Sequence, residues 1–113
     1  MTSRPPISAR CVAERLANPE TTLLEALPQR HWSAGHIPGA KRVNVESAAT
    51  DAIEAGVSKR SPVLVYCTGP TCSNSQQAAD ALIAAGFEKV AVFEGGKEAW
   101  LAAGYSLEVP DDR

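Results

Sequence analysis

The part of the chain that decides the fold reads PVLVYCTGPTCSNSQQAADALIAAG, from Pro62 to Gly86. Its apolar run at residues 63–65 is continuous rather than alternating, which is typical of a strand covered on both faces. A turn-rich segment at residues 67–72 follows directly. After it the pattern predicts a helix from about Ser73, with small and apolar residues on one stripe and Gly86 at its end. The stretch therefore predicts a central strand, a short loop and a helix.

The same alternation of strand and helix extends to both sides of this stretch. The predicted elements are a helix capped by Ser8 and ending near Asn18-Pro19, a strand at 22–27, a helical turn at 29–34 stopped by Gly35, a brief strand at 43–45, a weak helix at 47–56, a strand at 90–93 and a helix ending at Gly104. This order predicts an α/β domain with a parallel sheet between two layers of helices. Ligands bind such sheets at the carboxyl ends of the strands.

Length and composition limit the class of protein. A chain of 113 residues with 44% hydrophobic residues can bury one core, which excludes disorder as its main state. A net charge of −2 without runs of one sign excludes the basic surface that non-specific nucleic-acid or anionic-membrane binding needs. We expect one domain over residues 8–106, flexible termini at 1–7 and 107–113, and small molecules or proteins as partners.

The cysteines direct attention to thiol chemistry. No apolar stretch approaches the roughly 20 residues of a spanning helix, and residues 1–10 hold no signal-peptide core, so we expect a cytoplasmic protein. The chain has three cysteines, an odd and small number for a secreted scaffold. At least one thiol is therefore expected to be free.

Cys67 is the leading candidate for chemistry. It follows the central strand, so loop amides and the first turn of the next helix should surround its sulfur with N–H donors. Such a site favours an anion, which predicts a lowered pKa and a nucleophilic thiolate. Gly69 and Pro70 preset the loop, and small side chains leave room for a substrate. The alternative is a buried cysteine that only packs in the core.

The remaining candidates have structural interpretations beside functional ones. Cys72 either packs at the helix start or attacks an oxidised or persulfidated Cys67 to form a disulfide. Cys11 lies on the apolar stripe of the first helix and is expected in the core. His36 lies in a turn, where fixing the loop through backbone hydrogen bonds is favoured over acting as a base for Cys67. Because Cys67 and Cys72 are not a Cys-x-x-Cys pair, and His31 and His36 lie well before them, no metal site is predicted.

Four separated motifs together resemble a known family. They are Gly35-His36-Ile37-Pro38-Gly39-Ala40, then Val63-Leu64-Val65-Tyr66-Cys67 with the helix from Ser75 to Leu82, then Phe93-Glu94-Gly95-Gly96, and last Ala99-Trp100 with Ala103-Gly104. In this order they resemble a single rhodanese domain over residues 8–106. The resemblance implies a five-stranded parallel sheet flanked by helices on both faces, and sulfurtransferase activity of the thiosulfate sulfurtransferase type.

The resemblance also implies roles for the loop. The Cys67 thiolate would take sulfane sulfur from thiosulfate or another persulfide donor, become a persulfide, and pass the sulfur to cyanide, a thiol or a protein cysteine. No metal or organic cofactor is implied. The segment that would hold the transferred sulfur consists of Thr68, Gly69, Pro70, Thr71, Cys72 and Ser73.

Two departures from the family pattern leave other functions open. Glu25-Ala26-Leu27 stands where members often have Asp-Val-Arg, and Cys72 stands where many have an arginine. Without that guanidinium, thiosulfate is a weaker candidate donor and phosphatase chemistry is disfavoured. Lys97 is expected to be a solvated helix residue. The alternatives are a rhodanese-like module that binds a protein without turnover, and a redox switch using Cys67 and Cys72.

Overall fold

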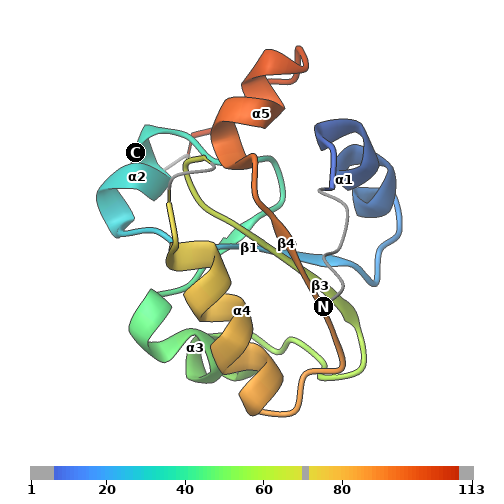
Figure 1. The fold of residues 1–113 in the computed structure, drawn as a ribbon, viewed down its shortest axis with the longest axis vertical. Helices are drawn as coiled ribbons and strands as arrows, with labels where there is room; N and C mark the ends of the chain where they lie inside the picture. Colours follow the sequence, from blue (N-terminus) through green and yellow to red (C-terminus); the bar gives the residue numbers. More distant parts are fainter. Residues whose placement is uncertain (1–6, 70–71, 110–113) are drawn as a thin grey trace, which may run out of the picture.

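The computed structural model describes residues 7–69 and 72–109. Its sheet has four parallel strands in the order β2-β1-β3-β4, flanked by helices (Figure 1). The strands are β1 Thr22–Glu25, β2 Lys41–Arg42, β3 Pro62–Tyr66 and β4 Lys89–Phe93. The helices are α1 Ala9–Leu16, α2 Gln29–Ala34, α3 Ala48–Glu54, α4 Asn74–Ala84, α5 Gly96–Ala102 and the short 3-10 helix η1 Val45–Ser47.

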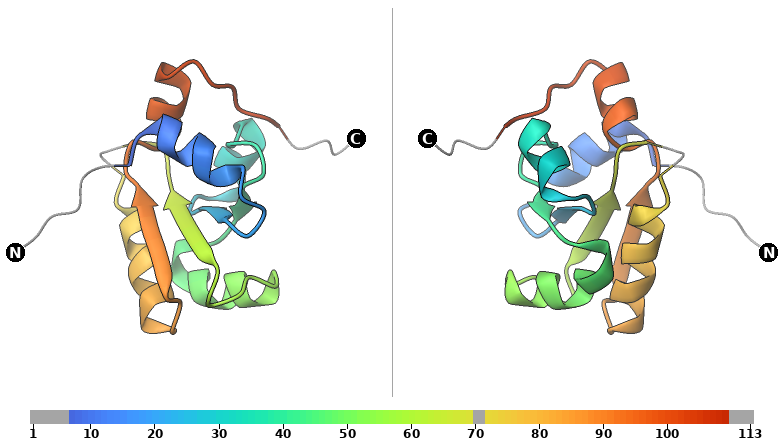
Figure 2. Two further views of the ribbon diagram at one scale, coloured as in Figure 1. Left: turned by 90° about the vertical axis from the view of Figure 1, so that its right-hand side faces the viewer. Right: turned by 90° about the vertical axis from the view of Figure 1, so that its left-hand side faces the viewer.

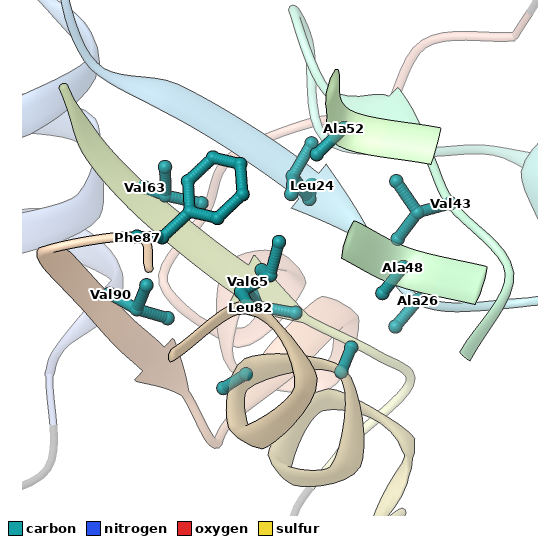
Figure 3. Close-up of a cluster of buried hydrophobic side chains, with 12 residues drawn as sticks. Leu24, Ala26, Val43, Ala48, Ala52, Val63, Val65, Leu82, Phe87 and Val90 are labelled. Atoms are coloured by element: carbon teal, nitrogen blue, oxygen red, sulfur yellow. The ribbon is translucent and has the colours of Figure 1, made fainter. Parts of the chain in front are cut away.

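Helices cover both faces of the sheet (Figure 2), and each face carries a separate core. One core packs α3 and α4 against the sheet, and in Figure 3 Leu82 of α4 lies over Val65 of β3. The other core packs α1 and α5 against side chains that include Leu64 and Tyr66 of β3. Alternate residues of β3 therefore enter opposite cores, which explains why its apolar run is continuous.

Most predicted elements are confirmed, including the central position of β3. Ser8 caps α1 by accepting a hydrogen bond from the Cys11 N–H at 3.1 Å. Gly35 after α2 and Gly86 after α4 have φ of 147° and 103°, values that favour glycine. The sequence alone thus located the ends of these helices correctly.

Two expectations need correction. The described residues form four strands rather than the five that the resemblance implied, and three of them overlap strands predicted from the chain's own pattern. The strand predicted at 43–45 lies earlier, at Lys41–Arg42. The chain turns into η1 because the Asp51 carboxylate accepts hydrogen bonds from the Asn44 N–H at 2.8 Å and the Ser47 hydroxyl at 3.1 Å.

The end of the described chain returns to the loop before β2. Glu108 and His36 exchange two backbone hydrogen bonds of 2.9 and 2.8 Å. Leu107 packs against the core beneath α5. Among residues 7–69 and 72–109, none of the helices has the length and apolar character needed to cross a membrane.

Candidate functional site

The carboxyl ends of three strands meet at one edge of the sheet. Glu25, Tyr66 and Phe93, the last residues of β1, β3 and β4, stand side by side in the parallel register. Cys67 follows Tyr66 directly, so its position at the carboxyl edge of the sheet is as predicted.

The start of α5 fixes the first residues of the loop after β3. The N–H groups of Lys97 and Glu98 donate to the carbonyls of Cys67 and Thr68 at 3.1 and 3.0 Å. Gly96 allows this approach, because its φ is 57° and a Cβ there would collide with the Cys67 carbonyl. Gly96 therefore serves close packing against the loop.

The Cys67 thiol is buried, with 1% of the residue exposed. Its Sγ donates to the main-chain oxygen of Cys72 at 3.4 Å, and it lies 3.5 Å from the Ser75 hydroxyl, which can donate to it. Burial raises the pKa of Cys67, and the contact with Cys72 raises it further, whereas hydrogen bonds from Ser75 lower it. The predicted lowering of this pKa is wrong, because the loss of water around the sulfur outweighs the donors that reach it.

Cys72 is in a different environment five residues later. It is partly exposed, its N–H donates to the Gly69 carbonyl at 3.1 Å, and it lines a cavity of about 260 Å³ together with Ser75 and Glu94. Burial raises the pKa of Cys72, but hydrogen bonds from Cys67, Asn74 and Thr68 outweigh this and leave it below its ordinary value. Of the two thiols, Cys72 is thus the one that ionises more readily.

The other predicted loop residues have mixed positions. Thr68 is partly buried, Gly69 is buried and Ser73 is exposed at the start of α4. The Ser73 hydroxyl accepts a hydrogen bond from the Gln77 side chain at 3.1 Å. Pro70 and Thr71 lie outside the described residues. The roles of these residues toward a substrate stay predictions.

A buried polar cluster on the other face of the sheet was missed by the sequence reasoning. The Tyr66 hydroxyl donates to Oε1 of Glu25 at 2.6 Å and accepts from the Ile37 N–H at 3.0 Å. Lys97 Nζ lies 3.4 Å from the same Glu25 oxygen and donates to the His31 carbonyl at 2.8 Å. The one available signal was a glutamate inside an apolar strand, which requires a buried partner.

Lys97 is therefore not the solvated helix residue that was expected. Its side chain is only 11% exposed, and it neutralises a carboxylate that is fully buried. Burial of the Tyr66 hydroxyl raises the pKa of Tyr66, with the Glu25 charge as the second cause. This cluster supports the end of β3 from the face opposite the Cys67 sulfur.

His36 has the structural role that was predicted. Its ring stacks on Trp32 with centroids 3.5 Å apart, and Nδ1 lies 3.1 Å from the Trp32 carbonyl. Nε2 lies 3.3 Å from the Glu108 carboxylate. Both ring nitrogens are thus engaged in holding the turn before β2, away from the thiol.

Comparison with known proteins agrees with this geometry. The family model for the rhodanese-like domain matches residues 8–103. The chain belongs to the rhodanese family. Thiosulfate sulfurtransferase GlpE of Pseudoalteromonas translucida is 31% identical over 103 residues, which cover 91% of this chain and 93% of that protein.

Solved structures of rhodanese-like proteins share the fold. The crystal structure of the Alr3790 protein from Anabaena sp. is 30% identical with a TM-score of 0.82, and the match covers 93% of each chain. A thiosulfate sulfurtransferase from Pseudomonas aeruginosa is 28% identical with a TM-score of 0.79, over 96% of this chain and 21% of that one. The rhodanese fold and a distant relationship to thiosulfate sulfurtransferases are therefore established for this chain.

Proposed function

We propose that this rhodanese domain is a sulfurtransferase that carries sulfane sulfur as a persulfide on Cys67. The observation that carries the proposal is the position of this cysteine at the carboxyl end of the central strand, held at the start of the loop by α5 and facing Ser75 of α4. The relationship to thiosulfate sulfurtransferases supports the same chemistry.

The reaction has two steps on one sulfur atom. The Cys67 thiolate attacks the outer sulfur of the donor, the sulfur–sulfur bond of the donor breaks, and sulfite or the donor thiol leaves with the electron pair. A thiophilic acceptor then attacks the outer sulfur of the persulfide and returns the thiolate. Because burial raises the pKa of Cys67, loading should accelerate as the pH rises above the ordinary thiol value of about 8.5.

Charges near the loop favour one class of donor. Glu94 lines the cavity beside Cys72, and the Glu98 carboxylate lies against Gly69. An arginine that could clamp an anion is replaced by Cys72. Carboxylates repel the dianion thiosulfate, so we expect persulfides of less negative thiols to be better donors.

Intact-mass measurement tests the assignment. Immediately after brief treatment with thiosulfate or with polysulfide, before any incubation, the wild type should carry the mass of one added sulfur atom, and added cyanide should remove it. Cys67→Ser should gain none, whereas Cys11→Ser, with the third cysteine changed on α1, should behave as the wild type. A Cys67→Ser chain that keeps the adduct would contradict the proposal.

A second candidate function is favoured by the burial of Cys67. A rhodanese-like module that binds a protein partner without turnover would need no accessible thiolate, and this thiol is buried with a raised pKa. Under this alternative, no donor would add sulfur to the wild type, and Cys67→Ala would retain the partner in a pull-down. Rapid loading of Cys67 would exclude it.

A further inference from the structure

The two cysteines of the loop differ in their access to solvent. Cys67 is buried, whereas Cys72 is partly exposed and lines the cavity formed with Ser73, Ser75, Gln76, Val92 and Glu94. They are nevertheless neighbours, because Cys67 Sγ lies 3.4 Å from the main-chain oxygen of Cys72. Of the two loop thiols, the one beside the buried Cys67 is thus partly open to the surface.

The two sulfurs have unequal roles. Hydrogen bonds from Asn74 and Thr68 lower the pKa of Cys72, and they do not depend on the proton that Cys67 loses when it becomes a persulfide. A thiolate is the attacking species in thiol–disulfide chemistry. Cys72 is therefore the thiol prepared to attack, and Cys67 is the sulfur prepared to be attacked.

We propose that Cys72 is a resolving thiol that discharges the Cys67 persulfide. This inference rests on the proposed function, since the persulfide must form first. The Cys72 thiolate attacks Sγ of Cys67, a bond forms between the two cysteine sulfurs, and the bond from Cys67 Sγ to the outer sulfur breaks. The outer sulfur leaves with the electron pair as hydrosulfide, and the product is a disulfide across the loop.

The step balances without an added oxidant. The persulfide already carries two oxidising equivalents, which pass to the cysteine pair while the outer sulfur is reduced to sulfide. An external dithiol reductant then returns both cysteines to thiols and is itself oxidised to a disulfide. Transfer of the outer sulfur to an acceptor competes with this step.

The experiment loads the protein without an acceptor and follows both products. Reduced wild type, Cys72→Ser and Cys11→Ser are treated anaerobically with a small excess of polysulfide, freed of it, and incubated. Released sulfide is quantified, and the remaining thiols are blocked before intact-mass measurement. A sample without donor must keep all three thiols blockable.

The expected result separates the variants. Wild type and Cys11→Ser should release about one sulfide per chain and lose two blockable thiols, those of Cys67 and Cys72. Cys72→Ser should keep the added sulfur on Cys67 and release sulfide at least ten-fold more slowly. The Cys67–Cys72 link should appear in peptide mapping of the wild type.

Failure of this inference and failure of the proposed function give different patterns. A wild type that keeps its added sulfur with Cys72 still blockable overturns the resolving role and leaves the sulfurtransferase proposal standing. Absence of added sulfur from Cys72→Ser, together with an unchanged wild type, overturns both. Equal sulfide release by wild type and Cys72→Ser also overturns the resolving role.

Discussion

Tyr66 and Cys67 are neighbours in the chain, yet their side chains are buried on opposite faces of the sheet. The polar group of each is paired in a different way. The Tyr66 hydroxyl meets the buried Glu25, whose charge is matched by Lys97. The Cys67 thiol meets neutral groups, the Ser75 hydroxyl and the Cys72 carbonyl. On the face that holds Tyr66, here called the charged face, the buried Glu25 carboxylate is tolerated because the Lys97 cation accompanies it. On the face that holds Cys67, here called the neutral face, the hydrogen-bond partners of the thiol carry no positive charge, so the thiol keeps its proton.

Lys97→Met tests the charged face most severely. It removes the cation but keeps an apolar stem, and it leaves the Glu25 carboxylate buried without its counter-charge. We expect the free energy of unfolding, measured by urea denaturation, to fall by about 3–5 kcal/mol. A loss under about 1 kcal/mol, typical of a surface pair, would mean that the pair has no such role.

Two further variants make the Lys97 result interpretable. Lys41→Met removes an exposed lysine of β2 and should change stability by less than about 0.5 kcal/mol. The double change Glu25→Gln with Lys97→Met removes both charges and should recover part of the loss. A double variant no more stable than Lys97→Met alone would contradict the charge argument.

Tyr66→Phe removes the hydroxyl that hydrogen-bonds both the Glu25 carboxylate and the Ile37 N–H. The Ile37 N–H then loses its acceptor, and Glu25 loses its shortest hydrogen bond. We expect a loss of about 1–3 kcal/mol in the same denaturation experiment. The control is Tyr105→Phe, which keeps the ring stacked on Trp100. An equal effect of the two changes would disprove the role of the Tyr66 hydroxyl.

The contrast between the faces also explains what the sequence could and could not predict. Periodicity and glycine positions located β3, α4 and the place of Cys67, because these depend on residues close together in the chain. The cluster of Glu25, Tyr66 and Lys97 joins residues up to 72 positions apart, the difference between 97 and 25. No local pattern carries such a contact.

The error over the Cys67 pKa has a similar cause. Local reasoning counted the amide donors expected near the thiol, which act within a few residues. Burial depends instead on how closely α4 and α5 pack on the loop, and it is the larger influence. Whether a donor-rich site also excludes water could be judged only from the three-dimensional structure.

Ser75→Ala tests how the neutral face sets the pKa of the Cys67 thiol. The Ser75 hydroxyl is the side-chain group that lowers the pKa of Cys67, so its removal should raise this pKa further. Loss of one hydrogen bond of about 1 kcal/mol predicts roughly five-fold slower alkylation of Cys67 near neutral pH. Alkylation is followed by mass spectrometry in a Cys11→Ser background, and Ser73→Ala on the exposed start of α4 is the control. An unchanged rate would show that Ser75 does not tune this thiol.

The smallest expected effect is the dependence of stability on alkaline pH. The raised pKa of Cys67 means that the folded protein keeps the thiol proton after the unfolded chain has lost it. The contribution of this thiol to stability is complete below its pKa of about 8.5 in the unfolded chain. It is lost as the pH rises from there toward the raised pKa of the folded protein. The slope of the free energy of unfolding against pH cannot exceed about 1.4 kcal/mol per pH unit for one proton.

Between pH 8 and 10, Cys72→Ser should therefore lose stability faster than the double variant Cys67→Ser with Cys72→Ser. Tyr66, whose pKa is raised from an ordinary value of about 10, is present in both variants, so its contribution cancels in the comparison. Parallel curves would mean that the neutral face does not hold its thiol protonated, and the contrast with the charged face would disappear.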